Sequence, residues 1–167
     1  VLYDLDLPLV LFADALFFLA ISPELCPENA VITPHFKEMQ SFFPEEKSSE
    51  RRVYFSKIQK WVNVKNLVFV LKGAPTIIFS KNAVPWIVPR GSPAMAKAGV
   101  GDVLTGVIAA FLTQGQSPLK AAILGVYLHA TAGESVQIDK SSYGLIASDL
   151  IEKIPSILSC WEKNHSL

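Results

Sequence analysis

Hydrophobic residues in the first half of the chain form short continuous runs separated by more polar segments. Three runs have strand length: LPLVLFAD (7–14), NAVITP (29–34) and NLVFVLKG (66–73). Runs of this kind are typical of strands that are buried on both faces of a sheet. The residues that follow the first two runs, ADALFFLA and HFKEMQSFF, have the spacing of short helices.

Two further patterns precede the glycine-rich middle of the chain. Residues 45–62 are polar and charged with periodic apolar positions, which predicts an amphipathic surface helix. The segments TIIFS (76–80) and VPWIV (84–88) flank the turn residues Lys81 and Asn82, and together they predict a β-hairpin.

The second half of the chain has a helical pattern throughout. Residues 100–115 are apolar on almost every side and end at Gly115, which predicts a buried helix. A second helix is expected from Pro118 to about Val136, and one or two short helices are expected around Pro155. The alternation of strands and helices predicts an α/β layered domain, with a largely parallel central sheet covered by helices and residues 1–167 forming a single domain.

The composition narrows the classes of partner and compartment. Fifteen basic residues balance fifteen acidic ones, which disfavours a nucleic-acid groove or a basic membrane-binding face. The apolar run of residues 7–21 is too short to span a bilayer, and Asp14 interrupts it. Cys26 and Cys160 have no metal-type spacing, and two lone cysteines favour a reducing, cytoplasmic location. Because half of the residues are hydrophobic and only 18% are charged, we also expect a homo-oligomer.

The segment GSPAMAKAGVGDVLTG (91–106) places one acid, Asp102, among glycines at the start of an apolar helix. The simplest interpretation of such an aspartate is a helix N-cap. The glycines favour a second interpretation, because Gly99 and Gly101 allow a ligand to approach the backbone, and amides at a helix N-terminus bind anions. A carboxylate beside a phosphate site is suited to take a proton from a hydroxyl that attacks phosphorus.

Four ordered motifs together resemble a known family. GSPAMAKAGVGDVLTGVIAAFLTQG followed by AAILGVYLHATAG is similar to the ADP/ATP-dependent NAD(P)H-hydrate dehydratases, the ribokinase-like family also called the YjeF C-terminal domain. FADAL (12–16), TPHFKE (33–38) and LKGAPT (71–76) resemble the DADAL, TPHPGE and LKGAGT of that family, in the same order. The resemblance implies a ribokinase-like fold. Because the chain reaches FADAL within its first sixteen residues, we expect it to lack the N-terminal part of the family domain and to be inactive alone.

The resemblance also implies roles for individual residues. Asp102 would be the catalytic base and would contact the substrate, together with His35 and Asp14. From the residues alone, His35 could equally be a helix-start histidine, and Lys72 an exposed hairpin lysine. His129 lies within an apolar helix and is expected to be a buried, hydrogen-bonded packing residue. The nucleotide site would comprise Lys72, Gly73, Ala74, Pro75, Thr76, Gly99, Val100 and Gly101.

The implied activity is the repair of hydrated NADH or NADPH, with ADP or ATP as the phosphoryl donor. The hydrate hydroxyl would be phosphorylated, and loss of phosphate would restore the ring double bond. Mg²⁺ would accompany the nucleotide without a dedicated set of protein ligands. Two alternatives remain open: a vitamin-precursor kinase of the ribokinase superfamily and a non-catalytic nucleotide-binding subunit. Pro75 and Val100 depart from the family pattern, and both lie in the expected nucleotide site.

Overall fold

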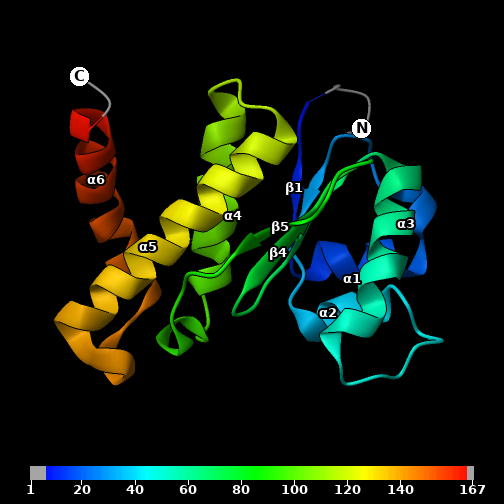
Figure 1. The fold of residues 1–167 in the computed structure, drawn as a ribbon, viewed down its shortest axis with the longest axis horizontal. Helices are drawn as coiled ribbons and strands as arrows, with labels where there is room; N and C mark the ends of the chain where they lie inside the picture. Colours follow the sequence, from blue (N-terminus) through cyan, green and yellow to red (C-terminus); the bar gives the residue numbers. More distant parts are fainter. Residues whose placement is uncertain (1–6, 165–167) are drawn as a thin grey trace.

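The computed structural model describes residues 7–164, which form one mixed sheet with helices on both faces (Figure 1). The strands are paired in their order along the chain. The first three are parallel to one another, and the last three are joined by antiparallel pairings. They are β1 (Val10–Leu11), β2 (Val31–Ile32), β3 (Val68–Leu71), β4 (Thr76–Phe79) and β5 (Trp86–Val88).

The expected α/β architecture is confirmed, and the predicted hairpin is formed by β4 and β5. The sheet is parallel only across β1–β3 because the tight turn after β3 and the hairpin after β4 both reverse the chain. The first strand is shorter and more exposed than its sequence suggests. Among the described strands β1 pairs only with β2, so it lies at an edge of the sheet and its two residues are half-buried.

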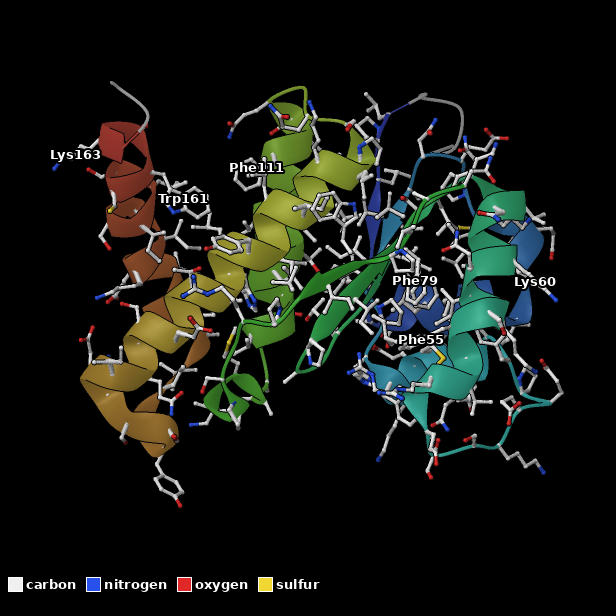
Figure 2. All side chains as sticks on the ribbon, in the orientation of Figure 1. Phe55, Lys60, Phe79, Phe111, Trp161 and Lys163 are labelled. Carbon is white, nitrogen blue, oxygen red and sulfur yellow. The ribbon has the colours of Figure 1, made fainter. Side chains whose placement is uncertain are left out.

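The helices α1 (Asp14–Ile21), α2 (Phe36–Ser41) and α3 (Phe55–Lys65) cover one face of the sheet (Figure 1). Alternate residues of β3, Phe69 and Leu71, point into the core on this side. The rings of Phe55 in α3 and Phe79 in β4 meet edge to face, with centroids 5.6 Å apart. Figure 2 shows these two side chains close together. The amphipathic helix predicted over residues 45–62 begins later than expected. Residues 45–50 are not helical, and the first helical turn of this region is η3 (Arg51–Tyr54).

The helices α4 (Val100–Thr113) and α5 (Pro118–Gly144) cover the other face, where Val68 and Val70 of β3 point. The two helices approach closely at Gly125, because a Cβ atom there would lie 2.6 Å from Cγ1 of Ile108. Each helix buries one side and exposes another, as Gly106 of α4 and Ile138 of α5 show, so the prediction of helices buried all round is only partly confirmed. The second helix also extends beyond its expected end at about Val136.

The last helix, α6 (Ala147–Asn164), forms an outer layer against α4 and α5 (Figure 1). It runs through Pro155 without a break. Pro155 is exposed, so the carbonyl that loses its helical partner can be solvated, and the amphipathic face of the helix still packs on α5. In Figure 2 Trp161 points from this helix toward α5, where its ring lies 5.8 Å from that of Tyr127.

The parallel strands end at the same edge of the sheet, and this edge carries three residues that the sequence singled out. Asp14 follows β1, His35 follows β2 and Lys72 follows β3. The amide of Lys72 donates a hydrogen bond to the carbonyl of Pro34 at 2.9 Å, which ties the last two strand ends together. Ligand sites of α/β proteins gather at the carboxyl ends of strands, so this edge is the place to look for a site.

Candidate functional site

A cavity of about 500 Å³ lies between the turn after β3 and the segment that leads into α4. Its lining is mainly apolar and includes seven of the residues expected from sequence to form the site. Those seven are His35, Lys72, Gly73, Ala74, Thr76, Val100 and Gly101. The cavity is large enough for a small organic ligand or a nucleotide.

The N-terminus of α4 provides one end of this cavity. Gly99 is the N-cap, with φ at +81°, a left-handed conformation that glycine adopts without strain. The amides of Asp102 and Val103 donate to the Gly99 carbonyl, whereas the amide of Gly101 has no backbone acceptor among residues 7–164. Gly101 lines the cavity, so the positive end of the helix dipole faces the ligand space.

Lys72 brings a positive charge to the same place. Its side chain is 23% exposed, and a Cβ atom on Gly101 would lie 3.4 Å from its ammonium nitrogen. The ammonium also forms an ion pair with Glu38 at 3.7 Å. Lys72 is therefore not the exposed hairpin lysine that was the simpler expectation. An ammonium against a helix N-terminus is suited to bind an anion, above all a phosphate.

His35 caps α2 and also lines the cavity. Its Nδ1 accepts a hydrogen bond from the amide of Glu38 at 3.1 Å, and the Glu38 carboxylate accepts one from the amide of His35 at 2.6 Å. This capping box confirms the helix-start interpretation of the histidine. Because Nδ1 accepts a hydrogen bond, the proton of the neutral ring lies on Nε2, which is a donor.

The turn between β3 and β4 is held by side chains on both of its sides. The Thr76 hydroxyl donates to the carbonyl of Gly73 at 2.9 Å. The guanidinium of Arg51, in η3, donates to the carbonyls of Pro75 at 3.1 Å and Leu71 at 3.3 Å. Arg51 was not a candidate from the sequence, since it lies in a polar segment twenty residues before the turn it contacts.

Asp102 is not the N-cap of α4. Asp102 is the third residue of α4, makes no capping hydrogen bond, and is exposed to solvent. The N-cap expectation for Asp102 is therefore wrong, because Gly99 holds that position. Asp102 follows Gly101 in the chain but, unlike Gly101, does not line the cavity. Asp14 is exposed in the first turn of α1, and it also lies outside the lining, as do Pro75 and Gly99.

His129 of α5 reaches the first turn of α4, as a buried and hydrogen-bonded residue. The residue is 7% exposed, and Nε2 lies 2.9 Å from the carbonyl oxygen of Val100. Burial lowers the pKa of His129 to about 4, the Val100 carbonyl opposes that shift, and nearby Lys72 adds to it. The imidazole is therefore neutral near pH 7, and Nε2–H donates to Val100. This confirms the packing role expected from sequence.

The segment before α4 is fastened to α5 by a set of contacts that the sequence did not reveal. The Glu134 carboxylate accepts hydrogen bonds from the Arg90 guanidinium at 2.5 and 3.0 Å, and from the amide of Gly91 at 2.8 Å. The hydrogen bond from Arg90 holds the pKa of Glu134 below its usual range. Ser92 is hydrogen-bonded to Gln137, one turn further along α5. The three-residue spacing of Glu134 and Gln137 is the signal that could have indicated this face.

Within the described part of the chain, no group of three or more His, Cys, Asp or Glu side chains is arranged to hold a metal ion. None of the helices described here is long and apolar enough to cross a membrane.

The fold places the chain in the ribokinase-like class. A ribokinase-like superfamily protein from Enterococcus faecalis has a TM-score of 0.76 at 25% identity, over 91% of this chain and 52% of that one. The crystal structure of ADP/ATP-dependent NAD(P)H-hydrate dehydratase from Bacillus subtilis, co-crystallized with ATP/Mg²⁺, has a TM-score of 0.81 at 28% identity, over 95% of this chain and 56% of that one.

Residues 2–156 match the family model of the NAD(P)H-hydrate dehydratases, and the chain belongs to this family. A bifunctional NAD(P)H-hydrate repair enzyme from Moorella thermoacetica is 35% identical over 156 residues, which are 92% of this chain and 29% of that protein. The chain thus spans about half of the length of the Bacillus structure and under a third of the Moorella protein. The resemblance drawn from the four sequence motifs is confirmed.

Proposed function

We propose that this chain contributes the nucleotide site and the catalytic base of an enzyme that dehydrates hydrated NADH or NADPH at the expense of ADP or ATP. The observation that carries the proposal is the ammonium of Lys72 against Gly101 at the N-terminus of α4. A helix N-terminus and a cation on one side of a 500 Å³ cavity are suited to hold the phosphates of a nucleotide.

In this proposal the phosphates lie between Lys72 and the Gly101 amide. Gly73, Ala74 and Thr76 form the wall on one side of the nucleotide, and the segment after Arg90 forms the other. Val100 is part of the lining, whereas Pro75 and Gly99 lie outside it and are proposed to shape the two walls through the backbone. The family membership and the ATP/Mg²⁺ of the Bacillus structure support this assignment of the ligand.

Asp102 is proposed as the general base. Asp102 is exposed and follows Gly101 in the first turn of α4, and in this proposal its carboxylate accepts the proton of the hydrate hydroxyl as that oxygen attacks the terminal phosphorus. The bond from phosphorus to the bridging oxygen of the nucleotide breaks, and AMP or ADP leaves. The phosphate on the hydrate then leaves with its oxygen, the neighbouring ring carbon loses a proton to water, and the electron pair of that C–H bond restores the ring double bond. His35, whose Nε2–H is available as a donor, and Asp14 are proposed to contact the hydrate.

Mg²⁺ is proposed to arrive with the nucleotide. The described residues offer no cluster of carboxylates or imidazoles that fits the ion, so its ligands would come from the phosphates and water. The ion neutralises charge on the phosphates when bound. The roles given above to Lys72, Gly101 and Asp102 do not depend on where it lies.

The ligand-induced shift of the melting temperature tests this proposal against its alternatives, because a ligand that binds the native state raises its stability. Chemically hydrated NADH added together with ADP should raise the melting temperature beyond the effect of ADP alone. A larger shift with a hydroxymethylpyrimidine or hydroxyethylthiazole would indicate a vitamin-precursor kinase. A shift with nucleotide that none of these substrates increases would indicate a nucleotide-binding subunit.

A cytoplasmic location and a homo-oligomer also remain predictions for this protein.

A further inference from the structure

We propose that Arg51 is a positioning residue of the nucleotide site, which holds the turn between β3 and β4 in the shape that receives the nucleotide. The inference rests on the proposed function, because it concerns the same cavity. It adds a residue from outside the motifs that define the family resemblance.

The geometry of the guanidinium is the first observation. Nη2 donates to the carbonyl of Leu71 and Nη1 donates to the carbonyl of Pro75, so a single planar group bridges the two ends of the turn. Between these two residues lie Lys72, Gly73 and Ala74, which all line the cavity. Because the guanidinium fork is rigid, its two hydrogen bonds fix the separation of the carbonyls. Lysine has no comparable fork.

The close fit against Gly73 is the second observation. A Cβ atom at Gly73 would lie 2.7 Å from Nη1 of Arg51 and 3.0 Å from its Cζ. The guanidinium therefore packs directly on the backbone at the middle of the turn. This contact explains why glycine occupies that position, and it leaves the opposite side of the turn to face the cavity.

The charge of Arg51 is the third observation. Among the ion pairs of residues 7–164, none joins Arg51 to a carboxylate, and its hydrogen-bond acceptors are neutral carbonyls. Partial burial lowers the pKa of Arg51, although a guanidinium stays charged at any working pH. An uncompensated positive charge behind the turn favours an anionic ligand in front of it.

Arg52 provides a matched control. It is the next residue in the same helical turn, and its side chain is exposed. Substitution of Arg52 changes the net charge and the local helix propensity as substitution of Arg51 does, but it leaves the turn untouched.

The experiment compares Arg51→Met, Arg51→Lys and Arg52→Met with the unmodified protein. Binding of ADP and ATP is measured by calorimetry, and KM for nucleotide, KM for hydrated NADH and kcat are measured in the repair assay. Arg51→Met should weaken nucleotide binding at least about tenfold, because it removes two hydrogen bonds from a charged donor. KM for the hydrate and kcat at saturating nucleotide should change much less. Arg51→Lys should recover part of the affinity, and Arg52→Met should bind as the unmodified protein does.

Unchanged nucleotide affinity in folded Arg51→Met would overturn the proposal. An equal loss in Arg52→Met would also overturn it, because the effect would then be one of net charge. A fall in kcat and a rise in both KM values together would show general structural damage instead of positioning. If the unmodified protein binds no nucleotide, the proposed function fails, which is a different outcome from a failure of Arg51. Arg51→Lys keeps the charge and most of the packing, so it serves if Arg51→Met does not fold.

Discussion

The imidazole of His129, in the middle of α5, donates a hydrogen bond to the carbonyl of Val100, the first residue of α4, over 2.9 Å. This bond joins the most buried part of one helix to the turn of the other that carries Gly101 and Asp102. Because Val100 begins the helix, the bond fixes the direction in which the first amides point. The stability of the fold and the shape of the anion site are therefore linked through one side chain.

That link predicts a pH dependence of stability. The pKa of His129 is lowered from 6.5 to about 4 in the native state, so between these values the unfolded chain takes up a proton that the native state does not. The contribution of the neutral ring is complete above pH 6.5 and is lost as the pH falls toward 4. From pH 7 to pH 5, the unfolding free energy should fall by up to about 2 kcal/mol through this residue.

Urea unfolding of the unmodified protein and of His129→Gln at the two pH values measures this contribution. Glutamine places an amide nitrogen near the position of Nε2 and does not titrate. The variant should therefore lose less stability than the unmodified protein when the pH is lowered. An identical loss in both proteins would show that His129 is not the responsible group.

A valine at position 101 should impair nucleotide binding more than folding. The backbone of Gly101 is helical, so the requirement for glycine comes from space: a side chain would enter the gap to Lys72, where a Cβ atom already comes within 3.4 Å of Nζ. Gly106→Val is the matched control, since that position is on the same helix, is exposed, and has nothing within 4 Å of an added Cβ. We expect a nucleotide affinity at least about tenfold weaker for Gly101→Val, a loss of about 1.4 kcal/mol. If Gly101→Val and Gly106→Val bound nucleotide equally well, the N-terminus of α4 would not be part of the nucleotide site.

Asp102→Asn should abolish turnover while nucleotide binding stays nearly intact. The asparagine has the same shape and removes no cap, because Gly99 and not Asp102 begins the helix. A positioned general base contributes roughly 10²–10⁴ in rate, and the variant should lose that factor in kcat. Retention of more than about a tenth of the rate, far above what loss of a general base leaves, would exclude Asp102 as the base.

An exposed apolar face on α1 bears on the expected association. Phe17, Phe18 and Ile21 are each at least 60% exposed, and the exposed Leu25 ends the short helical turn η2 (Pro23–Leu25) that follows α1. Such residues are seldom left together in contact with water. Light scattering at micromolar concentration should show a homo-oligomer, and Phe18→Glu should shift it toward monomer. A monomeric unmodified protein would contradict the expectation.

Much of the fold could be predicted from the sequence, because burial sets the clearest hydrophobic patterns along the chain. The run ending in Leu71 is apolar at every position, since β3 is buried on both faces between two helical layers. The edge strand β1 was harder to delimit, because its apolar neighbours belong to a loop and to α1. Pro155 suggested a break that did not occur, since tertiary packing of α6 outweighs one lost hydrogen bond.

The site was predicted less completely than the fold. Lys72 and Gly101 were found because they lie in motifs whose spacing is local. Arg51 and Glu134 act on backbone groups twenty or more residues away, and no local pattern reports such a contact. The prediction that Asp102 caps the helix was wrong, because the sequence does not show at which residue near Gly99 the helix begins.

The most direct test of the proposed repair activity is the recovery of NADH fluorescence from chemically hydrated NADH. Supplied with the remaining part of the family domain, which its relatives have, the chain should restore the fluorescence when ADP or ATP is present with Mg²⁺, release one phosphate for each NADH formed, and do neither without nucleotide. The Asp102→Asn variant should bind the nucleotide and restore almost no fluorescence. Failure of the folded, nucleotide-bound protein to restore any fluorescence with either nucleotide would contradict the proposed function.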